Sequence, residues 1–221
     1  MRAVLKLGGR VAGESIGLVH ERHADGDEVV VVHGAGPQIT DELAARGIAT
    51  MFVGGRRFTD PATLVVVRES LVAVGAELAA ALGPASLQLV GDEIGFEAVE
   101  LPWLGLVGDP RPCRPAAVEA ALAEGLIPVV TPIAVGPLNV NADEAAAALA
   151  VGVEADALVF VSDVPGVYLG GAVARELRAD AAGELLDSGA VDGGMVPKLL
   201  AAVRAARLGI TAEIGETAVV A

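Results

Sequence analysis

The feature that most constrains the fold is a set of short, continuously apolar segments that alternate with helical patterns. The run Val29–Val32 is apolar at every position, which is typical of a strand that is buried on both faces. Strands of this kind that alternate with helices indicate an α/β protein, with a mainly parallel sheet covered by helices.

Five apolar segments are expected to be strands: 3–7, 28–33, 87–90, 127–133 and 157–162. Six segments are expected to be helices: 37–46, 61–82, 115–124, 143–153, 181–188 and 195–208. Two shorter pieces, 51–54 and 96–101, are expected to form hairpins on this frame.

Composition and charge exclude several classes of protein. The chain has 221 residues, is 53% apolar and only 3% aromatic, so it can bury one sizeable core of small aliphatic side chains. Its formal charge of −14 disfavours nucleic acid or an anionic membrane as a partner. One cysteine, Cys113, excludes an internal disulfide, and the scattered His20, His23 and His33 do not resemble a metal site. We therefore expect no metal held by protein side chains.

No targeting or membrane segment is expected. A strand-like run begins at Arg2, where a signal peptide would lie, and the longest charge-free stretch, 125–142, is interrupted by Pro128, Pro132 and Pro137. These patterns, with the single cysteine, favour a cytoplasmic protein.

Glycine-rich or polar turns follow four of the expected strands, at 6–9, 33–37, 135–144 and 162–167. In parallel α/β sheets ligands bind at the carboxyl ends of the strands, where glycines and helix N-termini present backbone N–H groups to anions. The turns therefore predict a site for a phosphorylated ligand. A Walker A loop is excluded because no Gly-Lys pair exists, and 34–36 is only half of a dinucleotide fingerprint, because Ile39 stands at the third glycine position.

Lysine and asparagine are unusually rare. Of the fifteen basic residues only Lys6 and Lys198 are lysines. Lys6 lies near the end of a buried strand and Lys198 opens a helix, where a cation opposes the dipole. Either the composition of the genome or a functional requirement for ammonium groups at these two positions explains why lysine is so rare. Two ammonium groups with one carboxylate between them would suit phosphoryl transfer, which needs alignment and charge neutralisation.

The two asparagines and the carboxylates that follow them form a second polar cluster. Asn141 and Glu144 match a capping box, in which Glu144 reaches back to the N-cap residue. The capping box leaves Asn139 and Asp143 unexplained, although Asp143, taken alone, fits a carboxylate that gains from the helix dipole in the first turn.

Helix 61–82 is apolar over more than one face. Such a helix needs a second partner besides its own core, and either a homodimer interface or full burial within the monomer satisfies this requirement.

Several motifs together resemble the amino acid kinase family, most closely its acetylglutamate kinase branch. They occur in the family's order along nearly the whole chain: 6–9, 32–38, 55–60, 104–108, 127–130, 139–143, 162–167 and 194–198. The resemblance implies one domain over 1–221, a three-layer αβα sandwich with a mainly parallel central sheet. Residues up to about 135 would hold the acceptor and contribute a dimer helix at 61–82, and residues from about 136 would hold ATP with Mg²⁺.

The same resemblance implies a reaction and a set of roles. MgATP would phosphorylate the side-chain carboxylate of N-acetyl-L-glutamate, in arginine biosynthesis, with the metal held mainly by the nucleotide phosphates. By motif, the catalytic residues are Lys6, Lys198 and Asp143, the last holding the two lysines. The substrate residues are Gly34, Ala35, Arg57 and Asn139. The nucleotide residues are Gly8, Gly9, Asp163, Val164, Gly166, Val167, Asp192, Gly194 and Met195. Gly8, Gly9, Gly34 and Ala35 would act through their backbone N–H groups.

Two alternatives stay open beside this interpretation. A sibling kinase would use another carboxylate, such as an aminoadipate derivative, and a non-catalytic relative would bind nucleotide or amino acid as a sensor. For the acceptor carboxylate, Arg56 competes with Arg57, and strand alternation is expected to send one of the two outward.

Overall fold

The structure is a computed structural model that describes residues 1–8, 12–161 and 164–221, and for residues 12–14 only the backbone. The helices in this part are α1 (Ala12–Ala24), α2 (Gly36–Ala45), α3 (Pro61–Leu82), α4 (Ala116–Ala123), α5 (Ala142–Gly152), α6 (Ala179–Ser188) and α7 (Met195–Arg207), with short 3-10 turns η1 (Gly91–Glu93) and η2 (Pro102–Leu104). The strands are β1 (Arg2–Leu7), β2 (Glu28–His33), β3 (Phe52–Val53), β4 (Arg56–Arg57), β5 (Ser86–Val90), β6 (Ala98–Glu100), β7 (Val107–Pro110), β8 (Ile127–Thr131), β9 (Ile133–Ala134), β10 (Leu138–Val140), β11 (Ala157–Val161), β12 (Tyr168–Leu169), β13 (Ala172–Val173), β14 (Glu176–Arg178), β15 (Thr211–Ile214) and β16 (Thr217–Val220).

An eight-stranded sheet forms the centre of the molecule, in the order β14-β16-β15-β11-β1-β2-β8-β5. All of its pairings are parallel except that between β15 and β16. Strand β1 lies between β2, its neighbour in the sequence, and β11, which comes about 150 residues later. The predicted parallel sheet is confirmed.

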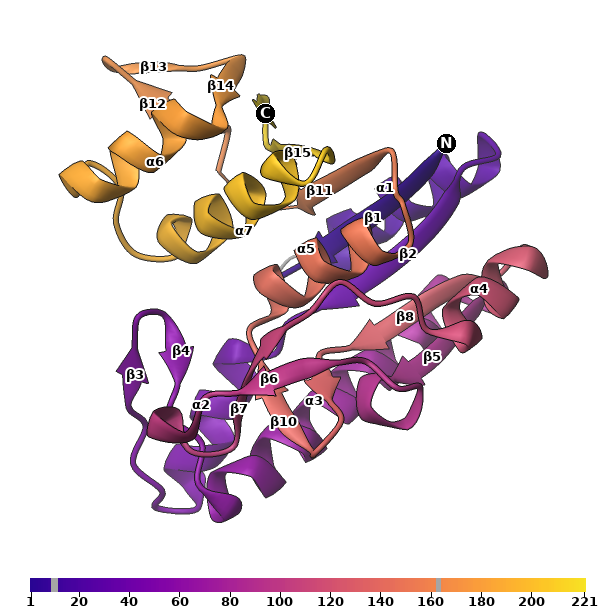
Figure 1. Ribbon diagram of the computed structural model, residues 1–221. Helices are drawn as coiled ribbons and strands as arrows, with labels where there is room; N and C mark the ends of the chain where they lie inside the picture. Colours follow the sequence, from indigo (N-terminus) through magenta and orange to yellow (C-terminus); the bar gives the residue numbers. More distant parts are fainter. Residues whose placement is uncertain (9–11, 162–163) are drawn as a thin grey trace.

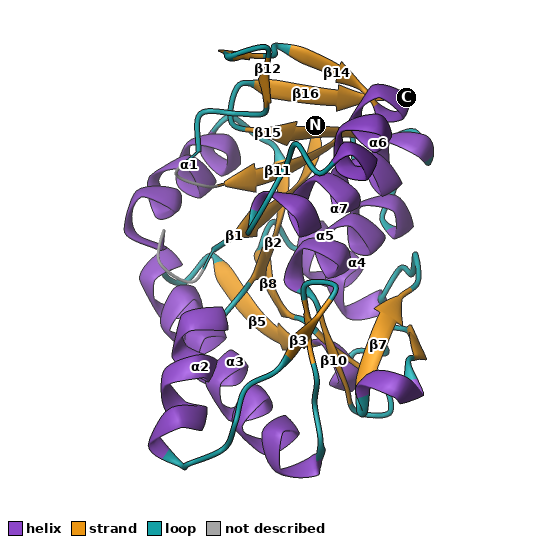
Figure 2. Ribbon diagram, turned by 90° about the vertical axis from the view of Figure 1, so that its left-hand side faces the viewer, coloured by secondary structure: helices purple, strands orange, loops and turns teal. Residues whose placement is uncertain are grey.

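Helices cover both faces of this sheet, which gives the predicted three-layer αβα sandwich. Figure 2 shows α1, α2 and α3 on one side of the sheet and α4, α5, α6 and α7 on the other. Strand alternation divides the core accordingly. Leu5 packs in a cluster with Leu78 and Leu82 of α3, whereas Val4 packs with the alanines of α5 and α7. Lys6 shares the face of Val4 and therefore points toward α5 and α7.

Smaller sheets lie beside the main one (Figure 1). A four-stranded sheet has the order β6-β7-β10-β9, and β3 and β4 form a hairpin of their own. The hairpin is joined to the four-stranded sheet region by a bridge between Thr59 and Gly105. Gly105 has φ +78°, and a Cβ there would lie 2.3 Å from the Thr59 carbonyl oxygen, so only glycine allows this approach.

Most predicted elements lie where the sequence places them, within about two residues of their predicted ends. The predicted strand 127–133 divides at Pro132, which lacks the N–H that the ladder needs, into β8 and β9. Helix α1 was not predicted, because its sequence holds two glycines and little apolar periodicity. Packing of Ile16 and Val19 on the sheet stabilises it instead.

Helix α3 is the longest helix in the described residues, with Asp60 as its N-cap, accepting from the Thr63 N–H at 2.7 Å. The protein's own core covers much of it, because Leu64, Val67 and Leu71 are buried, but Val65 is 52% exposed. No helix in the described part of the chain combines the length and apolarity needed to cross a membrane.

Candidate active site

Both lysines of the chain meet one carboxylate at the carboxyl end of β1. Lys6 Nζ lies 2.9 Å from Asp143 Oδ1, and Lys198 Nζ lies 4.0 Å from the same oxygen. Lys6 reaches it from β1, Asp143 from the first turn of α5 and Lys198 from the first turns of α7. All three side chains are at least 87% buried. The predicted convergence of the two ammonium groups is therefore confirmed.

The start of α5 fixes Asp143 in this position. The Asn141 side chain accepts from the N–H groups of Asp143 and Glu144, at 2.9 and 3.2 Å, and so caps the helix as predicted. The second half of the capping box is wrong. Glu144 does not reach back to the N-cap, because its carboxylate binds the Arg56 guanidinium in a bidentate pair.

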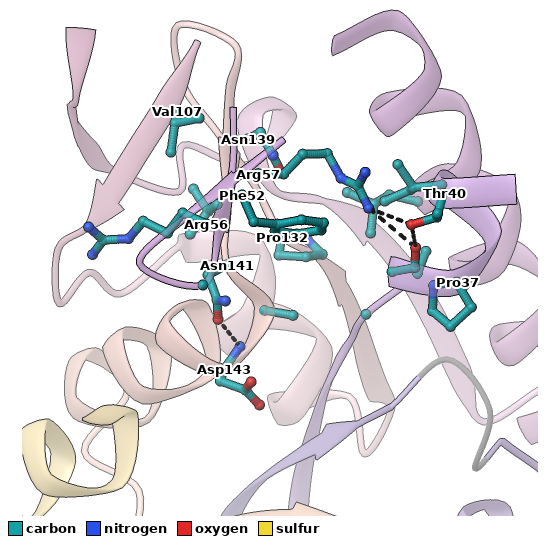
Figure 3. A pocket seen from close by; sticks show the side chains of 18 of the residues that line it. Pro37, Thr40, Phe52, Arg56, Arg57, Val107, Pro132, Asn139, Asn141 and Asp143 are labelled. Atoms are coloured by element: carbon teal, nitrogen blue, oxygen red, sulfur yellow. Dashed lines mark hydrogen bonds between the residues drawn. The ribbon is translucent and has the colours of Figure 1, made fainter. Parts of the chain in front are cut away.

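A cavity of about 520 Å³ opens in front of Lys6 and Asp143. Its other side is formed by Arg57, Phe52 and Thr40 (Figure 3). Arg57 is 7% exposed; it donates to Thr40 Oγ1 at 2.9 Å and to Thr50 Oγ1 at 3.1 Å, and its guanidinium lies 4.6 Å from the centre of the Phe52 ring. Burial lowers the pKa of Arg57, and no ion pair to it is found among the described residues. A buried guanidinium without a carboxylate is suited to bind one from a ligand.

Arg56 and Arg57 project in opposite directions from β4, as alternation predicted (Figure 3). Arg56 is paired with two carboxylates, Glu144 at 2.8 Å and Asp109 at 3.0 Å. Arg57 is therefore the arginine that has its guanidinium available to an acceptor.

Asn139 lies on β10 and also lines the cavity. Its side-chain amide donates to Thr59 Oγ1 at 2.9 Å, and Thr59 in turn donates to the Arg57 carbonyl oxygen at 2.8 Å. With the nitrogen so engaged, the Asn139 Oδ1 atom can accept a hydrogen bond from a ligand.

The second glycine turn lies at this cavity, and the glycines of the first turn lie elsewhere as far as they are described. Gly34 and Ala35 line it, but the Gly34 N–H donates to the Leu7 carbonyl oxygen at 3.0 Å. The expectation that this N–H faces a ligand is wrong, since it closes the turn instead. Gly8 follows β1 and lines a separate cavity of about 230 Å³ on the side of α1 and α3. Gly9 lies outside the described residues.

The expected nucleotide loop after β11 is described from Val164 onward, and Asp163 lies outside the described residues. Gly166 and Val167 are buried against the C-terminal strands rather than open to a cavity. The Val167 N–H donates to Thr217 Oγ1 at 2.8 Å, and Thr217 donates to the Ala174 carbonyl oxygen at 2.6 Å. Gly166 and Val167 therefore attach the loop to the C-terminal strands and do not face a cavity.

The remaining expected nucleotide residues lie at the start of α7, one turn from Lys198. Asp192 and Gly194 are exposed, Met195 is half-buried, and the Met195 N–H donates to the Asp192 carbonyl oxygen at 3.2 Å. Of the expected nucleotide residues that the structure describes, none lines the 520 Å³ cavity, so these residues are separate from the cavity's acceptor-facing residues.

His33, which precedes Gly34, is a buried residue that the motif interpretation leaves without a role. Burial lowers its pKa to about 4, and its Nε2 atom lies 3.3 Å from Thr131 Oγ1. Gly75 of α3 makes room for this pair, since a Cβ there would lie 2.8 Å from His33 Nε2.

Sequence reasoning missed the threonines that organise the site: Thr40 and Thr50 on Arg57, Thr59 under Asn139, and Thr217 under the loop. Thr40 carried a usable signal, because it is four residues from Gly36 and thus on the same side of α2. The other three contacts depend on how distant segments meet.

Known proteins resemble this chain over nearly its whole length. Residues 1–216 match the amino acid kinase family. The acetylglutamate kinase of Geobacillus stearothermophilus is 36% identical over 91% of this chain and 84% of its own length. That of Roseiflexus castenholzii is 40% identical over 82% of this chain and 75% of its own.

Solved structures extend the likeness to the fold. A Streptococcus mutans protein is 26% identical, with a TM-score of 0.89 over 99% of this chain and 98% of its own. An N-acetylglutamate synthase from Neisseria gonorrhoeae, solved with coenzyme A and N-acetyl-glutamate, has a TM-score of 0.82 at 21% identity, over all of this chain and 59% of its own. The chain belongs to the amino acid kinase family, a family of carboxyl-acceptor phosphotransferases.

Proposed function

We propose that this protein is an acetylglutamate kinase, which transfers the γ-phosphoryl group of ATP to the side-chain carboxylate of N-acetyl-L-glutamate. The product is an acyl phosphate, an early intermediate of arginine biosynthesis. Sequence identity of 36–40% to acetylglutamate kinases supports the choice of acceptor. A reaction that consumes ATP in biosynthesis is expected in the cytoplasm.

One observation carries this proposal: a single cavity has a buried guanidinium on one side and the Lys6–Asp143 pair on the other. In the proposed complex Arg57 holds the α-carboxylate of the acceptor through two hydrogen bonds, and Asn139 accepts from its acetamido N–H. The side-chain carboxylate then faces Lys6.

The proposed chemistry needs charge stabilisation rather than a base. A carboxylate nucleophile is already ionised at neutral pH, so no proton has to be removed. In the proposal Lys6 and Lys198 stabilise the negative charge on the transferring phosphoryl group, and Asp143 keeps both ammonium groups in place.

Magnesium fits this arrangement as a companion of the nucleotide. In the described residues no group of three or more His, Cys, Asp or Glu side chains is placed to hold a metal, and Asp143 is engaged by the lysines. Mg²⁺ keeps several waters and binds through nucleotide phosphates. When bound, it would add to the neutralisation of phosphate charge.

The proposal divides the chain into an acceptor half up to about residue 135 and a nucleotide half from about 136 to 221. The described cavity includes Asn139 and Asp143, so the acceptor meets the ATP-binding half at the start of α5. We also propose a homodimer through α3, on which Val65 is exposed; the edge strand β5 also carries an exposed apolar side chain, Leu87.

A hydroxamate-trapping assay tests the function. The chain is incubated with MgATP, hydroxylamine and one of three acceptors: N-acetyl-L-glutamate, an N-acylated aminoadipate or unacetylated glutamate. We expect hydroxamate with N-acetyl-L-glutamate and at least tenfold less with the others. Turnover of another acid only would instead indicate a sibling kinase, and nucleotide binding without turnover would indicate a sensor.

The Arg57→Lys variant tests the role of the cavity guanidinium. A lysine keeps the charge but loses the two parallel hydrogen bonds. We expect the KM for the acceptor to rise at least tenfold while the KM for ATP stays within about twofold of the wild type. An unchanged acceptor KM would remove the observation on which the proposal depends.

A further inference from the structure

The β3–β4 hairpin that carries Arg57 has few anchors of its own. Each strand has two residues and pairs only with the other, and Met51, Phe52 and Val53 are each about half exposed. An isolated hairpin of this size is marginally stable at best. The position of Arg57 therefore depends on contacts from the hairpin to the rest of the molecule.

Arg56 forms charged contacts between the hairpin and the rest of the molecule. Its Nε and Nη2 atoms donate to the two carboxylate oxygens of Glu144 at 2.9 and 2.8 Å, and Nη2 also donates to Asp109 Oδ1 at 3.0 Å. Glu144 is the residue after Asp143 in the first turn of α5. A bidentate pair is the most directional ion pair that two side chains can form.

The same network reaches the helix that carries Lys198. Arg204 of α7 donates to Asp109 Oδ1 at 3.0 Å and to the Pro110 carbonyl oxygen at 2.8 Å. The tip of the hairpin also lies near α7, since a Cβ on Gly55 would be 3.7 Å from the Pro197 side chain. The hairpin is thus connected to α5, β7 and α7.

The charges in this network stabilise the ion pairs of Arg56 with Glu144 and Asp109. Burial by itself would lower the pKa of Arg56, but hydrogen bonding to Glu144 and the charges of Glu144 and Asp109 outweigh it and raise the pKa. The side chains of Arg56 and Glu144 are 25% and 15% exposed, so the pair is partly shielded from water and stronger than a surface pair.

We propose that Arg56 is a positioning residue for acceptor binding: its pair with Glu144 ties the hairpin to α5, and alternation along β4 then directs Arg57 into the cavity. The inference rests on the proposed function for its kinetic readout. It assigns Glu144 this task in place of the capping-box role expected from the sequence, and it makes Arg56 a determinant of acceptor affinity without any contact to the acceptor.

The kinetic test uses Arg56→Gln and Glu144→Gln, each of which removes one partner of the pair. We expect the KM for the acceptor to rise about tenfold, equivalent to about 1.4 kcal/mol of binding free energy, while kcat and the KM for ATP stay within about twofold. The double variant should raise the acceptor KM by less than the product of the two single effects, because both remove one interaction.

Arg46→Gln is the matched control. Arg46 also pairs with two carboxylates, Glu42 and Glu69, but both pairs are exposed and lie on α2 and α3 away from the cavity. We expect it to leave both KM values unchanged. Arg56→Lys, which keeps the charge and loses the bidentate geometry, should give an intermediate acceptor KM and serves if Arg56→Gln does not fold.

Hydrogen exchange of residues 51–58 supplies a readout that does not depend on the acceptor. We expect this segment to exchange at least tenfold faster in Arg56→Gln, or in Arg56→Lys if that variant is needed, and at the wild-type rate in Arg46→Gln. A wild-type chain that phosphorylates no acceptor contradicts the proposed function. The exchange experiment then tests by itself whether the Arg56–Glu144 pair holds the hairpin.

Two results overturn the inference. Unaltered exchange of 51–58 shows that the pair does not hold the hairpin. An acceptor KM within twofold of the wild type, or an equal rise in both KM values together with a lower Tm, shows that the pair does not position Arg57.

Discussion

At the scale of single residues, one oxygen of Asp143 receives both ammonium groups of the chain. The three charges sum to +1, and like charges this close repel each other unless an anion lies between them. The Asp143 carboxylate therefore allows the ammonium groups of Lys6 and Lys198 to lie close together in a buried site. In the proposed reaction, an incoming phosphate would meet a site whose charge is already oriented, so little rearrangement would be needed in the transition state.

The Lys198→Ala variant tests this assignment. Removing one preorganised cation from a buried site is expected to lower kcat by two or more orders of magnitude, the usual size of a single electrostatic contribution. Steady-state kinetics with saturating MgATP measures it. Arg207→Ala, which removes an exposed cation from the last turn of the same helix, should keep wild-type kcat. Comparable activity in the Lys198 variant would refute the role of that residue.

The buried His33 makes the fold sensitive to acid. Its pKa in the folded protein is about 4, below the ordinary 6.5, so the unfolded chain binds the proton first as the pH falls. The stability from the neutral imidazole is fully present above about pH 6.5 and is lost as the pH falls toward 4. Between pH 7 and 4.5 this amounts to roughly 2 to 3 kcal/mol.

Urea unfolding at pH 7 and pH 4.5 checks this prediction. His33→Gln should lose about 2 to 3 kcal/mol less than the wild type over this interval, because glutamine does not titrate. His23→Gln, at a partly exposed position, should follow the wild-type curve. Parallel curves for the wild type and His33→Gln would contradict the neutral buried histidine.

At the scale of elements, the loop at 164–167 is supported by the turn between β15 and β16. Gly215 has φ +56°, and a Cβ there would lie 2.4 Å from the Pro165 carbonyl oxygen. The Glu216 N–H donates to this same oxygen at 2.7 Å. Thr217, which is fully buried, then holds Val167 and Ala174 together. A short C-terminal segment thus acts as the base of the expected nucleotide loop.

Thr217→Val tests this support. It keeps the shape of the side chain and removes the partner of the buried Val167 N–H, at a cost of about 1–3 kcal/mol, and the hydrogen bond to the half-buried Ala174 carbonyl oxygen. We expect the KM for ATP to rise severalfold with the acceptor KM unchanged. Thr211→Val, at an exposed position of β15, is the control; equal KM values for ATP in the two variants would show that Thr217 does not support the loop.

The sequence predicts those elements whose hydrophobic pattern is complete within the element. Strand β2 and helix α3 match their predicted ends. A continuous valine run marks β2, and a proline at the first position and a glycine after the last mark the ends of α3. Helix α1 lacks such a pattern and forms through its contacts with the sheet. The Glu144 side chain shows the same limit, since its partner Arg56 is 88 residues away.

At the scale of the whole molecule, the candidate site was predicted where rare residue types marked it. Lys6, Asp143 and Lys198 were brought together by residue type and motif order, and the structure joins them. The ion pairs of Arg56 with Glu144 and Asp109, the hydrogen-bonded Gly34 N–H and the threonines around Arg57 could not be read from the sequence. Each depends on side-chain geometry between segments that only the assembled sandwich brings into contact.

The proposed homodimer is tested at this scale. Val65 is 52% exposed on α3, and Val65→Asp would place a carboxylate in an apolar interface. Sedimentation velocity should show a dimer for the wild type and a weakened dimer for this variant. Glu77→Gln, at another exposed position of α3, should sediment like the wild type. A monomeric wild type at micromolar concentration would contradict the proposal.

The central place of β1 has a consequence for how the molecule is made. During synthesis β1 emerges before β2 and long before β11, which ends at Val161, so the edge of β1 that pairs with β11 stays open until β11 is made. Lys6 can meet Asp143 only after the start of α5 has been synthesised, and a nascent chain carries an open strand edge until β11 follows. Pausing of translation before residue 161 would expose this edge for longer and favour aggregation over completion of the sheet.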